Sequence, residues 1–382
     1  MRIAIIAGGI PSTTFIDALI NGLAERGNSV TVIGKKNGKN SYSNNVNTIE
    51  IPSKRIYQLL FILVNLWKMP FNEIKRIYKN SNRLTLAFLD YLYYLPIFMA
   101  KPDKVHIQWA ADLYNREILF DLFPNKIILS LRGSHINYTP IIKPEFGELY
   151  KKVFTKIYKF HAVSKAIALE AEKYGASSNK IHTINTSADD NLLNKIIHPK
   201  VSNSPLKLIV VGRFHWVKGY NYLLDALGIL KKQETSFHLI MIAGNDVPEE
   251  VIFSIHQNNL GDNIKIVNNL PHDEVLRHIE NADLLILPSV NEGIANVVIE
   301  AMALGTVALS SNCGGMPELI EDGINGLLFD NRNVIDLANK ISGYTKLSDE
   351  EKQIITGNAK ETINTKFTRS RMLDEFEILY SL

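Results

Sequence analysis

The first 34 residues, MRIAIIAGGIPSTTFIDALINGLAERGNSVTVIG, contain the pattern that decides the fold class. Residues 1–7 form a short apolar run that ends at Gly8 and Gly9, which we expect to form a turn. Apolar residues then recur at helical spacing over 15–23, and the β-branched run 29–34 predicts a second strand. A strand, a helix and another strand in this order indicate a βαβ unit, and hence a parallel sheet.

Strand-like apolar runs continue along the rest of the chain. We expect strands at 104–108, 126–131, 161–163, 180–184, 206–211, 238–243, 264–267, 284–287 and 307–310. Two helical stretches are predicted after Asp330, and the last carries an apolar stripe typical of a helix packed on a core: Met372, Phe376, Leu379 and Tyr380. The polar segment 34–47 is predicted to be a mobile surface loop.

The chain divides into two predicted domains. The segment IIHPKVSNSPLK, residues 196–207, gathers prolines, serines and an asparagine, and strand-like sequence restarts directly after it. Chain length supports this division, because single cores stop growing at about 250–300 residues. We expect an α/β protein with two doubly wound domains and a cleft between them. The predicted boundaries are 1–197 and 206–365, followed by a helix, 366–382, that packs back toward the first domain.

Composition excludes several classes of protein. Of the 382 residues, 46% are hydrophobic and 21% are charged, which excludes a disordered chain. The single cysteine, Cys313, cannot form an internal disulfide, and residues 1–9 lack the apolar core of a secretory signal. The longest apolar runs, 56–71 and 84–100, are interrupted by charged residues and prolines, so we expect no transmembrane helix. These features predict a cytoplasmic protein.

Charge is distributed unevenly between the two halves. Residues 1–200 hold 27 Lys and Arg against 15 Asp and Glu, a net charge of +12, whereas residues 201–382 have a net charge of −9. A basic lobe suits an anionic membrane surface, a phosphorylated acceptor or nucleic acid, and charge alone does not choose among them. The basic and aromatic stretch 54–83 would suit the anionic inner leaflet of a membrane. A core-facing helix pair with solvated lysines is the alternative for this stretch.

The segment EGIANVVIE places two carboxylates, Glu292 and Glu300, eight positions apart between a strand-like and a helical run. Gly293 permits a tight turn into the helix, so free backbone N–H groups near 294–297 would face outward and would bind a phosphate well. The two carboxylates would accept hydrogen bonds from sugar hydroxyls and from a ribose diol. Taken alone, this segment is explained more simply by two solvated glutamates at a helix end.

A second segment, GRFHWVKG at 212–219, lies between the predicted strand 206–211 and the helix that follows it. Arg213 and Lys218 are thereby two cations at the carboxyl end of a parallel strand, within an otherwise acidic lobe. Such a pair would neutralise a diphosphate and stabilise it as a leaving group. Ordinary surface cations are the alternative.

The ordered segments GRFHWVKG, IAGND, NNLPHDEV and NEGIANVVIE resemble the carboxy-terminal half of the family 4 retaining glycosyltransferases. The resemblance implies two facing Rossmann-like domains, which is the GT-B architecture. The resemblance covers about residues 206–330, and its E-x7-E element is specific in that context. The amino-terminal half is similar more loosely, through RIAIIAGG, HAVSKAI and INTSADD. The resemblance implies a nucleotide-diphosphate sugar donor held by the second domain, an acceptor held by the first, and retention of anomeric configuration.

The resemblance also implies roles for individual residues. Arg213 and Lys218 would hold the diphosphate, Glu292 would bind the donor sugar hydroxyls and Glu300 would bind the ribose. Backbone N–H groups would come from Gly293, Ile294, Ala295, Asn296 and Val297. Gly8 and Gly9 would let the first domain approach the donor phosphates. It implies transfer without a required metal or other cofactor. The sequence agrees, because it contains no two aspartates two positions apart and no zinc-type Cys/His cluster.

Retention is predicted to proceed by attack on the same face as the departing diphosphate, because no carboxylate in the first half must serve as a nucleophile. The loop Arg132-Gly133-Ser134-His135 departs from the family, which often has His before that glycine and an acidic residue two positions after it. Arg132 would bind an acidic acceptor or a phosphate, and His135 would contact the donor sugar as a catalytic residue. Either side chain would also serve as a structural hydrogen-bonding group, and Ser164 suits a helix cap.

The sequence therefore predicts a glycosyltransferase of surface polysaccharide biosynthesis that acts on a saccharide or lipid-linked saccharide and is peripheral to the inner face of the plasma membrane. One alternative is a nucleotide-sugar epimerase of the same architecture, which would need an acid/base pair beside the sugar ring. The other is a non-catalytic protein that binds an anionic polymer through its basic lobe. We expect no nucleic-acid partner, because no nucleic-acid motif accompanies the charge.

Overall fold

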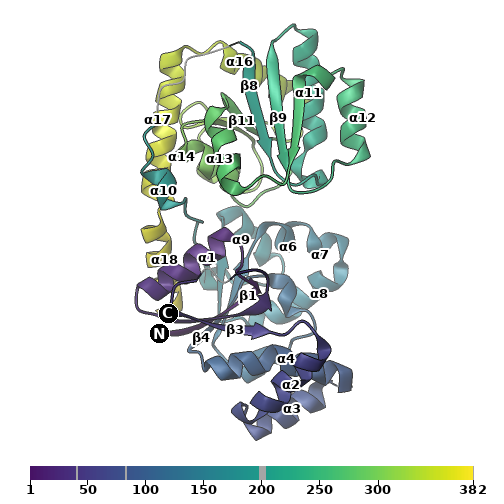
Figure 1. The fold of residues 1–382 in the computed structure, drawn as a ribbon, viewed down its shortest axis with the longest axis vertical. Helices are drawn as coiled ribbons and strands as arrows, with labels where there is room; N and C mark the ends of the chain where they lie inside the picture. The colour runs from purple at the N-terminus through teal and green to yellow at the C-terminus, as the bar shows by residue number, and fades with distance from the viewer. Residues whose placement is uncertain (40–41, 82–83, 198–203, 382) are drawn as a thin grey trace. The chain divides into compact units, whose positions relative to one another are not determined.

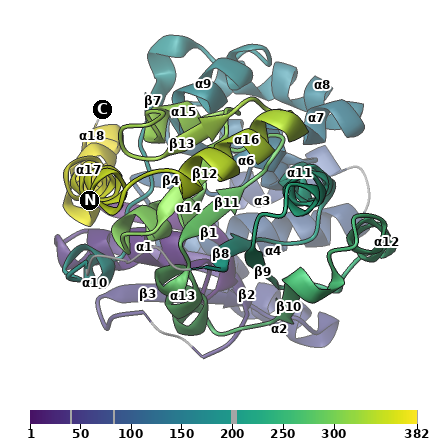
Figure 2. The same cartoon turned by 90° about the horizontal axis from the view of Figure 1, so that it is seen from above.

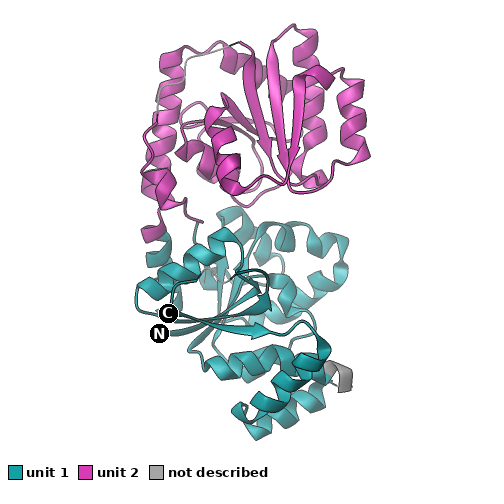
Figure 3. Cartoon of the chain, in the orientation of Figure 1, with its two compact units in different colours: residues 1–185, 372–382 teal, residues 186–371 magenta. Residues whose placement is uncertain are grey.

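The computed structural model of the chain describes residues 1–39, 42–81, 84–197 and 204–381. They form two compact units, residues 1–185 with 372–382, and residues 186–371 (Figure 3). Each unit contains one parallel β-sheet with helices on both faces (Figure 1). The predicted class, α/β with two doubly wound Rossmann-like domains, is confirmed.

The sheet of the first unit has the order β3-β2-β1-β4-β5-β6-β7, with all neighbours parallel. Its strands are β1 (Arg2–Ile10), β2 (Ser29–Lys36), β3 (Val46–Ile51), β4 (Lys104–Ile107), β5 (Ile127–Leu131), β6 (Lys159–Ala162) and β7 (Ile181–Thr183). Its helices are α1 (Thr14–Glu25), α2 (Arg55–Asn65), α3 (Phe71–Ser81), α4 (Leu84–Ala100), α5 (Leu119–Leu122), α6 (Gly133–Asn137), α7 (Thr139–Ile142), α8 (Pro144–Val153), α9 (Lys165–Glu172) and most of α18 (Arg369–Ser381).

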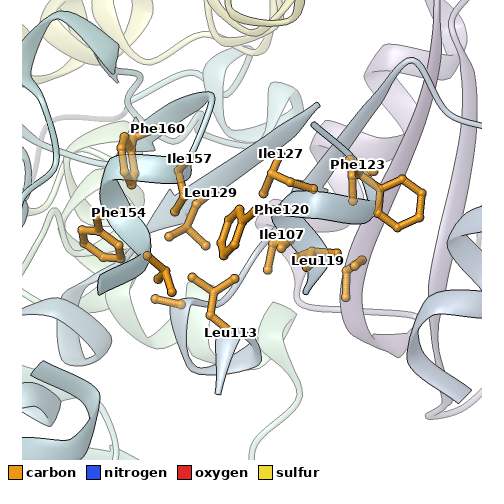
Figure 4. Close-up of a cluster of buried hydrophobic side chains, with 14 of the residues drawn as sticks. Ile107, Leu113, Leu119, Phe120, Phe123, Ile127, Leu129, Phe154, Ile157 and Phe160 are labelled. Atoms are coloured by element: carbon orange, nitrogen blue, oxygen red, sulfur yellow. The ribbon is translucent and has the colours of Figure 1, made fainter. Parts of the chain in front are cut away.

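Side-chain alternation along β1 gives this sheet two buried faces. Ile3 and Ile5 pack in a core cluster with apolar residues of α1 and α18, whereas Ala4 and Ile6 belong to the cluster on the other face. Aromatic side chains from α5, the turn after α8 and β6 fill much of this second cluster (Figure 4). The predicted stripe of the last helix is buried, and α18 is an integral part of the first unit's core.

The sheet of the second unit has the order β10-β9-β8-β11-β12-β13, again all parallel. Its strands are β8 (Leu206–Val211), β9 (Phe237–Ala243), β10 (Ile264–Asn268), β11 (Leu284–Leu287), β12 (Val307–Ser311) and β13 (Leu327–Phe329). Its helices are α10 (Asp190–Leu193), α11 (Tyr220–Lys232), α12 (Glu249–Gln257), α13 (His272–Asn281), α14 (Asn296–Ala303), α15 (Met316–Leu319), α16 (Val334–Thr345) and α17 (Asp349–Lys366). Helices α11 and α16 cover one face, and α13 and α14 the other (Figure 2).

Gly8 and Gly9 do not form the predicted turn. Strand β1 continues through them to Ile10, with a shift in its register against β2 between Ile6 and Gly8. Gly8 has a φ of +80°, a conformation that glycine adopts without a steric penalty. The strand can therefore absorb the irregularity and resume its pairing, and the glycines lie at its carboxyl end.

Three further expectations differ from the structure. Strand β3 begins at Val46, inside the predicted loop 34–47, because an edge strand with alternating polar side chains has little apolar signal. The short strand β13 was not predicted. Within residues 331–381, which the structure describes, there are three helices and not two, since Ser348 forms a capping box with Glu351 and starts α17.

The units divide at 185/186, whereas the predicted first domain extends to residue 197. The intervening residues pack on the second unit: Leu192 lies in a core cluster with α14, and Lys360 donates a hydrogen bond to the Leu192 carbonyl at 2.6 Å. Part of the predicted linker, residues 198–203, lies outside the described residues.

Candidate functional site

The strand order of the second unit brings two of the predicted segments together. The loop after β8 and the loop after β11 leave neighbouring strands at the position where the strand order reverses, which is where ligands bind in folds of this class. Lys218 in the first loop and Glu292 in the second form an ion pair, with Nζ and Oε1 2.6 Å apart. Both side chains are partly buried, at 24% and 16% exposure. The sequence predicted both residues but not their contact.

Backbone contacts hold these two loops against each other. Gly219 has a φ of +66°, and a Cβ there would lie 2.0 Å from the carbonyl oxygen of Pro288. The backbone N–H of Val290 donates to the Val217 carbonyl at 2.7 Å. Ser289 donates its hydroxyl to Oε1 of Glu292 at 2.8 Å, so that oxygen accepts from both the serine and the lysine. Glu292 is therefore fixed in place before any ligand binds.

A third loop, after β12, supports the backbone of Glu292. Gly314 has a φ of +51°, and a Cβ at this position would lie 1.9 Å from the Glu292 carbonyl oxygen. The same carbonyl accepts a hydrogen bond from the N–H of Gly315 at 3.2 Å. Sequence reasoning assigned no role to these glycines, although a Gly-Gly pair a few residues after a strand was an available signal. Burial raises the pKa of the adjacent Cys313 to about 11, so its thiol stays protonated at neutral pH.

Arg213 is exposed at the carboxyl end of β8. The next residue, Phe214, is held by the side chain of Asn245, whose amide accepts from the Phe214 N–H at 2.8 Å and donates to its carbonyl at 3.1 Å. Asn245 follows β9 and belongs to the IAGND segment, to which no function was assigned from the sequence. It anchors the backbone beside Arg213 and leaves the guanidinium exposed.

Helix α14 begins at Asn296, with Ala295 as a cap residue whose side chain makes no capping hydrogen bond. The first-turn N–H groups of α14 therefore have no side-chain cap, and Gly293 and Ile294 lie in the loop before the helix. Glu300 lies in the second turn of α14, because the helix begins only after Ala295.

Glu300 already has a hydrogen-bond partner. His272, the first residue of α13, donates from Nε2 to Oε1 of Glu300 at 3.0 Å, and this hydrogen bond raises the pKa of His272. His272 lies in the NNLPHDEV segment and was not among the predicted site residues. His272 therefore occupies Oε1 of Glu300, and any ligand that binds this oxygen would have to displace the histidine.

In the first unit, Arg132 follows β5 and lies among aromatic rings. Its guanidinium carbon is 4.4 Å from the ring centroid of Phe15 and 5.7 Å from that of Trp109. Nη2 donates to Oε1 of Gln108 at 2.8 Å, whereas Nε is enclosed without a hydrogen-bond partner among the described residues. Burial lowers the pKa of Arg132 to about 9, which leaves it charged at neutral pH. This cation lies in a desolvated environment where buried charges are normally paired.

His135 lies in the short helix α6, which starts directly after Arg132 and replaces the loop expected there, and its ring lies against Trp109, with ring centroids 5.5 Å apart. Its Nδ1 accepts a hydrogen bond from the backbone N–H of Ala111 at 3.3 Å. Burial, and then the charge of Arg132, lowers the pKa of His135. The neutral ring therefore carries its proton on Nε2, which is the nitrogen that would donate to a sugar hydroxyl.

A fully buried chain of hydrogen bonds crosses the first sheet beneath Arg132. Nε2 of His161 bonds the Ile184 carbonyl at 2.9 Å, so its Nδ1 accepts from the Ser130 hydroxyl at 2.8 Å. Ser130 then accepts from Nε2 of His106 at 2.8 Å, and Nδ1 of His106 accepts from the Tyr380 hydroxyl at 2.6 Å. This proton arrangement satisfies each bond with both histidines neutral. It joins α18 to the centre of the sheet.

Ser164 has the structural role that suited its sequence context. It is fully buried and caps α9, where its hydroxyl accepts from the N–H of Ile167 at 3.2 Å. Across the described ranges, no group of three or more His, Cys, Asp and Glu residues is placed to hold a metal ion. The helices in the described part of the chain are all too short or too polar to cross a membrane.

Comparison with known proteins extends these observations. Residues 194–362 match the family model described as Glycosyl transferases group 1. An amylovoran biosynthesis glycosyltransferase, AmsK of Erwinia amylovora, is 27% identical over 237 residues, which are 60% of this chain and 58% of that protein. A putative colanic acid biosynthesis glycosyltransferase, WcaL of Escherichia coli, is 26% identical over 254 residues, 64% of this chain and 61% of that protein. The chain thus matches less than two thirds of each relative.

Solved structures share the fold over the whole chain. A sucrose-phosphate synthase from Thermosynechococcus elongatus superposes with a TM-score of 0.76 at 17% identity, covering 99% of this chain and 98% of that one. HepE of Anabaena, solved in complex with UDP, gives a TM-score of 0.71 at 17% identity with full coverage of both chains. The chain therefore has the two Rossmann-like domains of the GT-B glycosyltransferases, and its residues 194–362 match the group 1 glycosyl transferases.

Proposed function

We propose that this chain is a retaining glycosyltransferase that transfers a sugar from a nucleoside-diphosphate sugar to a saccharide or lipid-linked saccharide. The observation that carries this proposal is the Lys218–Glu292 ion pair at the strand-order reversal of the second unit. It lies within the segment that matches the group 1 glycosyl transferases. A fixed cation beside a fixed carboxylate suits a substrate that joins a diphosphate to a polyhydroxylated sugar.

The donor would bind at the carboxyl end of the second sheet. Lys218 and Arg213 would hold the diphosphate, and the uncapped first turn of α14, with Gly293 to Val297, would supply N–H donors to its oxygens. Glu292 would keep one oxygen on Lys218 and Ser289 and offer the other to the sugar hydroxyls. Glu300 would accept from the ribose through Oε2, or through Oε1 once His272 is displaced.

The reaction would proceed on one face of the sugar. The bond from the anomeric carbon to the departing diphosphate oxygen breaks, and a bond to the acceptor hydroxyl oxygen forms on the same face. The acceptor proton passes to the departing diphosphate, so no protein base is consumed. Lys218 and Arg213 would stabilise the charge that develops on the diphosphate, which is where fixed cations accelerate such a step.

The first unit would bind the acceptor. His135 would donate from Nε2 to a hydroxyl of the donor sugar, and Gly8 and Gly9 would allow close approach of the donor phosphates. Arg132 would pair with a carboxylate or phosphate on the acceptor, because its guanidinium has no acidic partner among the described residues. We expect transfer to need no metal and to persist after chelation.

The acceptor class is suggested by the relatives. AmsK and WcaL are named for the biosynthesis of amylovoran and colanic acid. We propose a comparable role in assembling a surface polysaccharide at the cytoplasmic side of the membrane.

Thermal stabilisation of the purified protein by UDP, GDP, ADP, CMP and NAD, without added metal, tests the donor site directly, because a ligand that binds only the folded state raises the midpoint. UDP is the first candidate, since HepE was solved with UDP and with glucose. We expect one diphosphate to stand out and its shift to be lost in Lys218→Ala. A flat panel, or a shift that survives in this variant, would contradict the site.

The anomeric configuration of the product tests the reaction itself. We expect a product with the anomeric configuration of the donor, formed only when an acceptor is present. An inverted product would rule out the same-face mechanism. Release of an epimerised free sugar without an acceptor would instead identify the epimerase alternative.

A further inference from the structure

Helix α2 exposes most of its apolar side chains. Of its eleven residues only Ile62 is buried. Ile56, Tyr57, Leu59, Leu60, Leu63 and Val64 are all exposed, and the row continues beyond the helix with Trp67, 78% exposed, and Phe71, 67% exposed. These residues decide against the core-facing alternative for α2, because a core helix would bury them.

This exposure differs from that of an ordinary surface helix. A helix on the surface of a globular protein directs one apolar stripe inward and covers its outer face with polar residues. Helix α3 follows this rule, since Ile77 is buried while Lys75 and Lys79 are exposed. Helix α2 does not follow this rule, because most of its apolar side chains are exposed. A large exposed apolar surface usually marks a site of interaction with another molecule. In the first unit α2 and α3 lie beside α4, away from the centre of the sheet (Figure 1).

Cations surround this apolar row. Residues 51–81 contain six Lys and Arg and one acidic residue, Glu73, a net charge of +5. Lys68 lies 5.7 Å from the ring centroid of Trp67, and Lys75 lies 4.5 Å from that of Phe71. Aromatic rings with ammonium groups beside them suit the boundary between lipid tails and headgroups, where the ring enters the apolar layer and the charge meets phosphate.

The dimensions of the helix limit how it would meet a bilayer. Eleven residues of α-helix span about 16 Å, whereas the hydrocarbon core of a bilayer is about 30 Å thick. Helix α2 is therefore too short to cross, and would lie in the plane of the headgroups. Two copies of this chain would meet through this face only by bringing two patches of charge +5 together, which disfavours self-association.

We propose that residues 54–79, here called the α2–α3 surface, dock the protein on an anionic lipid bilayer, with α2 lying flat in the headgroup layer and the flanking cations on anionic phosphates. This inference goes beyond the proposed transfer reaction and does not depend on it. Its consequence is that the first unit, which would bind the acceptor, is held at the surface where a lipid-linked saccharide resides.

Flotation of the full chain with phosphatidylcholine vesicles, with and without phosphatidylglycerol, tests the proposal without any substrate. We expect binding to the anionic vesicles that weakens as salt is added, since each cation near such a surface strengthens binding about fivefold at low salt. Replacing Leu63, Val64 and Trp67 by serine should weaken binding at least about tenfold. The double variant Lys75→Glu, Lys79→Glu should do the same.

Matched controls come from the second unit. Ile252, Phe253 and Ile335 are exposed to a similar degree, and Lys232 and Lys346 are exposed cations. Replacing the first three by serine, or the two lysines by glutamate, should leave vesicle binding within about twofold of the parent protein. Equal melting midpoints for all four variants would show that folding is intact, since each change lies at the surface.

Three outcomes would overturn the proposal. The first is that the protein does not float with anionic vesicles at low salt. The second is that it floats equally well with neutral and anionic vesicles. The third is that the control variants lose as much vesicle binding as the variants of the α2–α3 surface. Concentration-dependent dimerisation that disappears in the serine variant, without vesicle binding, would assign the surface to a second copy instead.

Discussion

Lys218 is the residue on which the proposed chemistry depends most, because its ammonium group is already bound by Glu292. Lys218→Ala should lower the rate of transfer by about 100-fold to 1,000-fold, since a fixed charge acting on a leaving group is lost. It would also leave the Glu292 carboxylate unpaired near the diphosphate. Steady-state kinetics with the donor identified by thermal stabilisation would measure this loss.

Lys340 provides a matched control for that variant. It forms an ion pair with Asp322, also with an N–O distance of 2.6 Å and in the same unit. Lys340→Ala should change the rate by less than about twofold, because partly exposed ion pairs contribute little. Equal losses in the two variants would mean that the Lys218 effect is structural.

Arg132 should show a conflict between stability and function. Replacing this unpaired cation by methionine should raise the free energy of unfolding of the first unit by about 1 kcal/mol, because the desolvation cost of the charge disappears. Transfer to the acceptor should fall at least about tenfold. Denaturant unfolding and transfer kinetics on the same samples would measure both effects.

Replacing Arg116 tests whether the lack of an acidic partner explains the stability gain expected for Arg132→Met. It also lies over an aromatic ring, 3.8 Å from the centroid of Tyr93, but its charge interacts with Asp112 and Asp90. Arg116→Met should therefore destabilise the protein. If Arg132→Met also destabilises it and transfer is unaffected, Arg132 is a structural residue.

At the scale of elements, the loop after β12 positions the loop after β11 through one glycine. A Cβ on Gly314 would collide with the Glu292 carbonyl, whereas Gly323, with a φ of +76°, has no atom within 4 Å of its Cβ position. Both alanine variants should lose about 1 kcal/mol of stability from the left-handed backbone. Only Gly314→Ala should also lower transfer, by about tenfold or more, because it displaces Glu292.

Comparing the two alanine variants separates strain from displacement. Melting midpoints report the shared cost of the positive φ, and transfer kinetics report the position of Glu292. Unchanged kinetics in Gly314→Ala would show that the loop relaxes around the added methyl group and that its contact with Glu292 does not set the geometry of the site.

At the scale of the whole molecule, the buried histidines make the two units respond differently to acid. Burial lowers the pKa of His161 to about 3 and that of His106 well below its usual value of 6.5. In the unfolded chain both titrate near 6.5, so below that pH the unfolded state binds more protons than the folded state. The stability of the first unit should therefore fall as pH drops below 6.5, by up to about 1.4 kcal/mol per pH unit for each histidine.

Hydrogen exchange of the individual strands would measure this difference. Amides of β4 and β6 should lose protection between neutral and mildly acidic pH, after correction for the intrinsic exchange rate, while those of β8 and β12 serve as the internal reference. Equal loss of protection in both sheets would contradict the role of the histidines. The role of the histidines would be supported if, in the His161→Gln variant, the amides of β4 and β6 lost no more protection in acid than those of β8 and β12.

The sequence by itself determined the features that rest on local periodicity and spacing. The run 1–34 predicted a strand, a helix and a strand. The runs over 206–310 predicted β8 to β12 of the second sheet, because burial within a parallel sheet requires continuous apolar segments. The segments that hold Lys218 and Glu292 were recognisable because each follows a strand. The sequence did not predict β3 and β13, because the apolar pattern is weak where a strand is only partly buried or very short.

Only the tertiary structure decided which of these segments meet. Lys218 and Glu292 are 74 positions apart, and Tyr380 bonds a histidine 274 positions away. Such contacts depend on the order of strands in the sheet, which periodicity does not encode. The same holds for α2, because only the structure shows that its apolar side chains are exposed. Sequence periodicity shows which apolar side chains share one face of an element, whereas tertiary packing decides what covers that face.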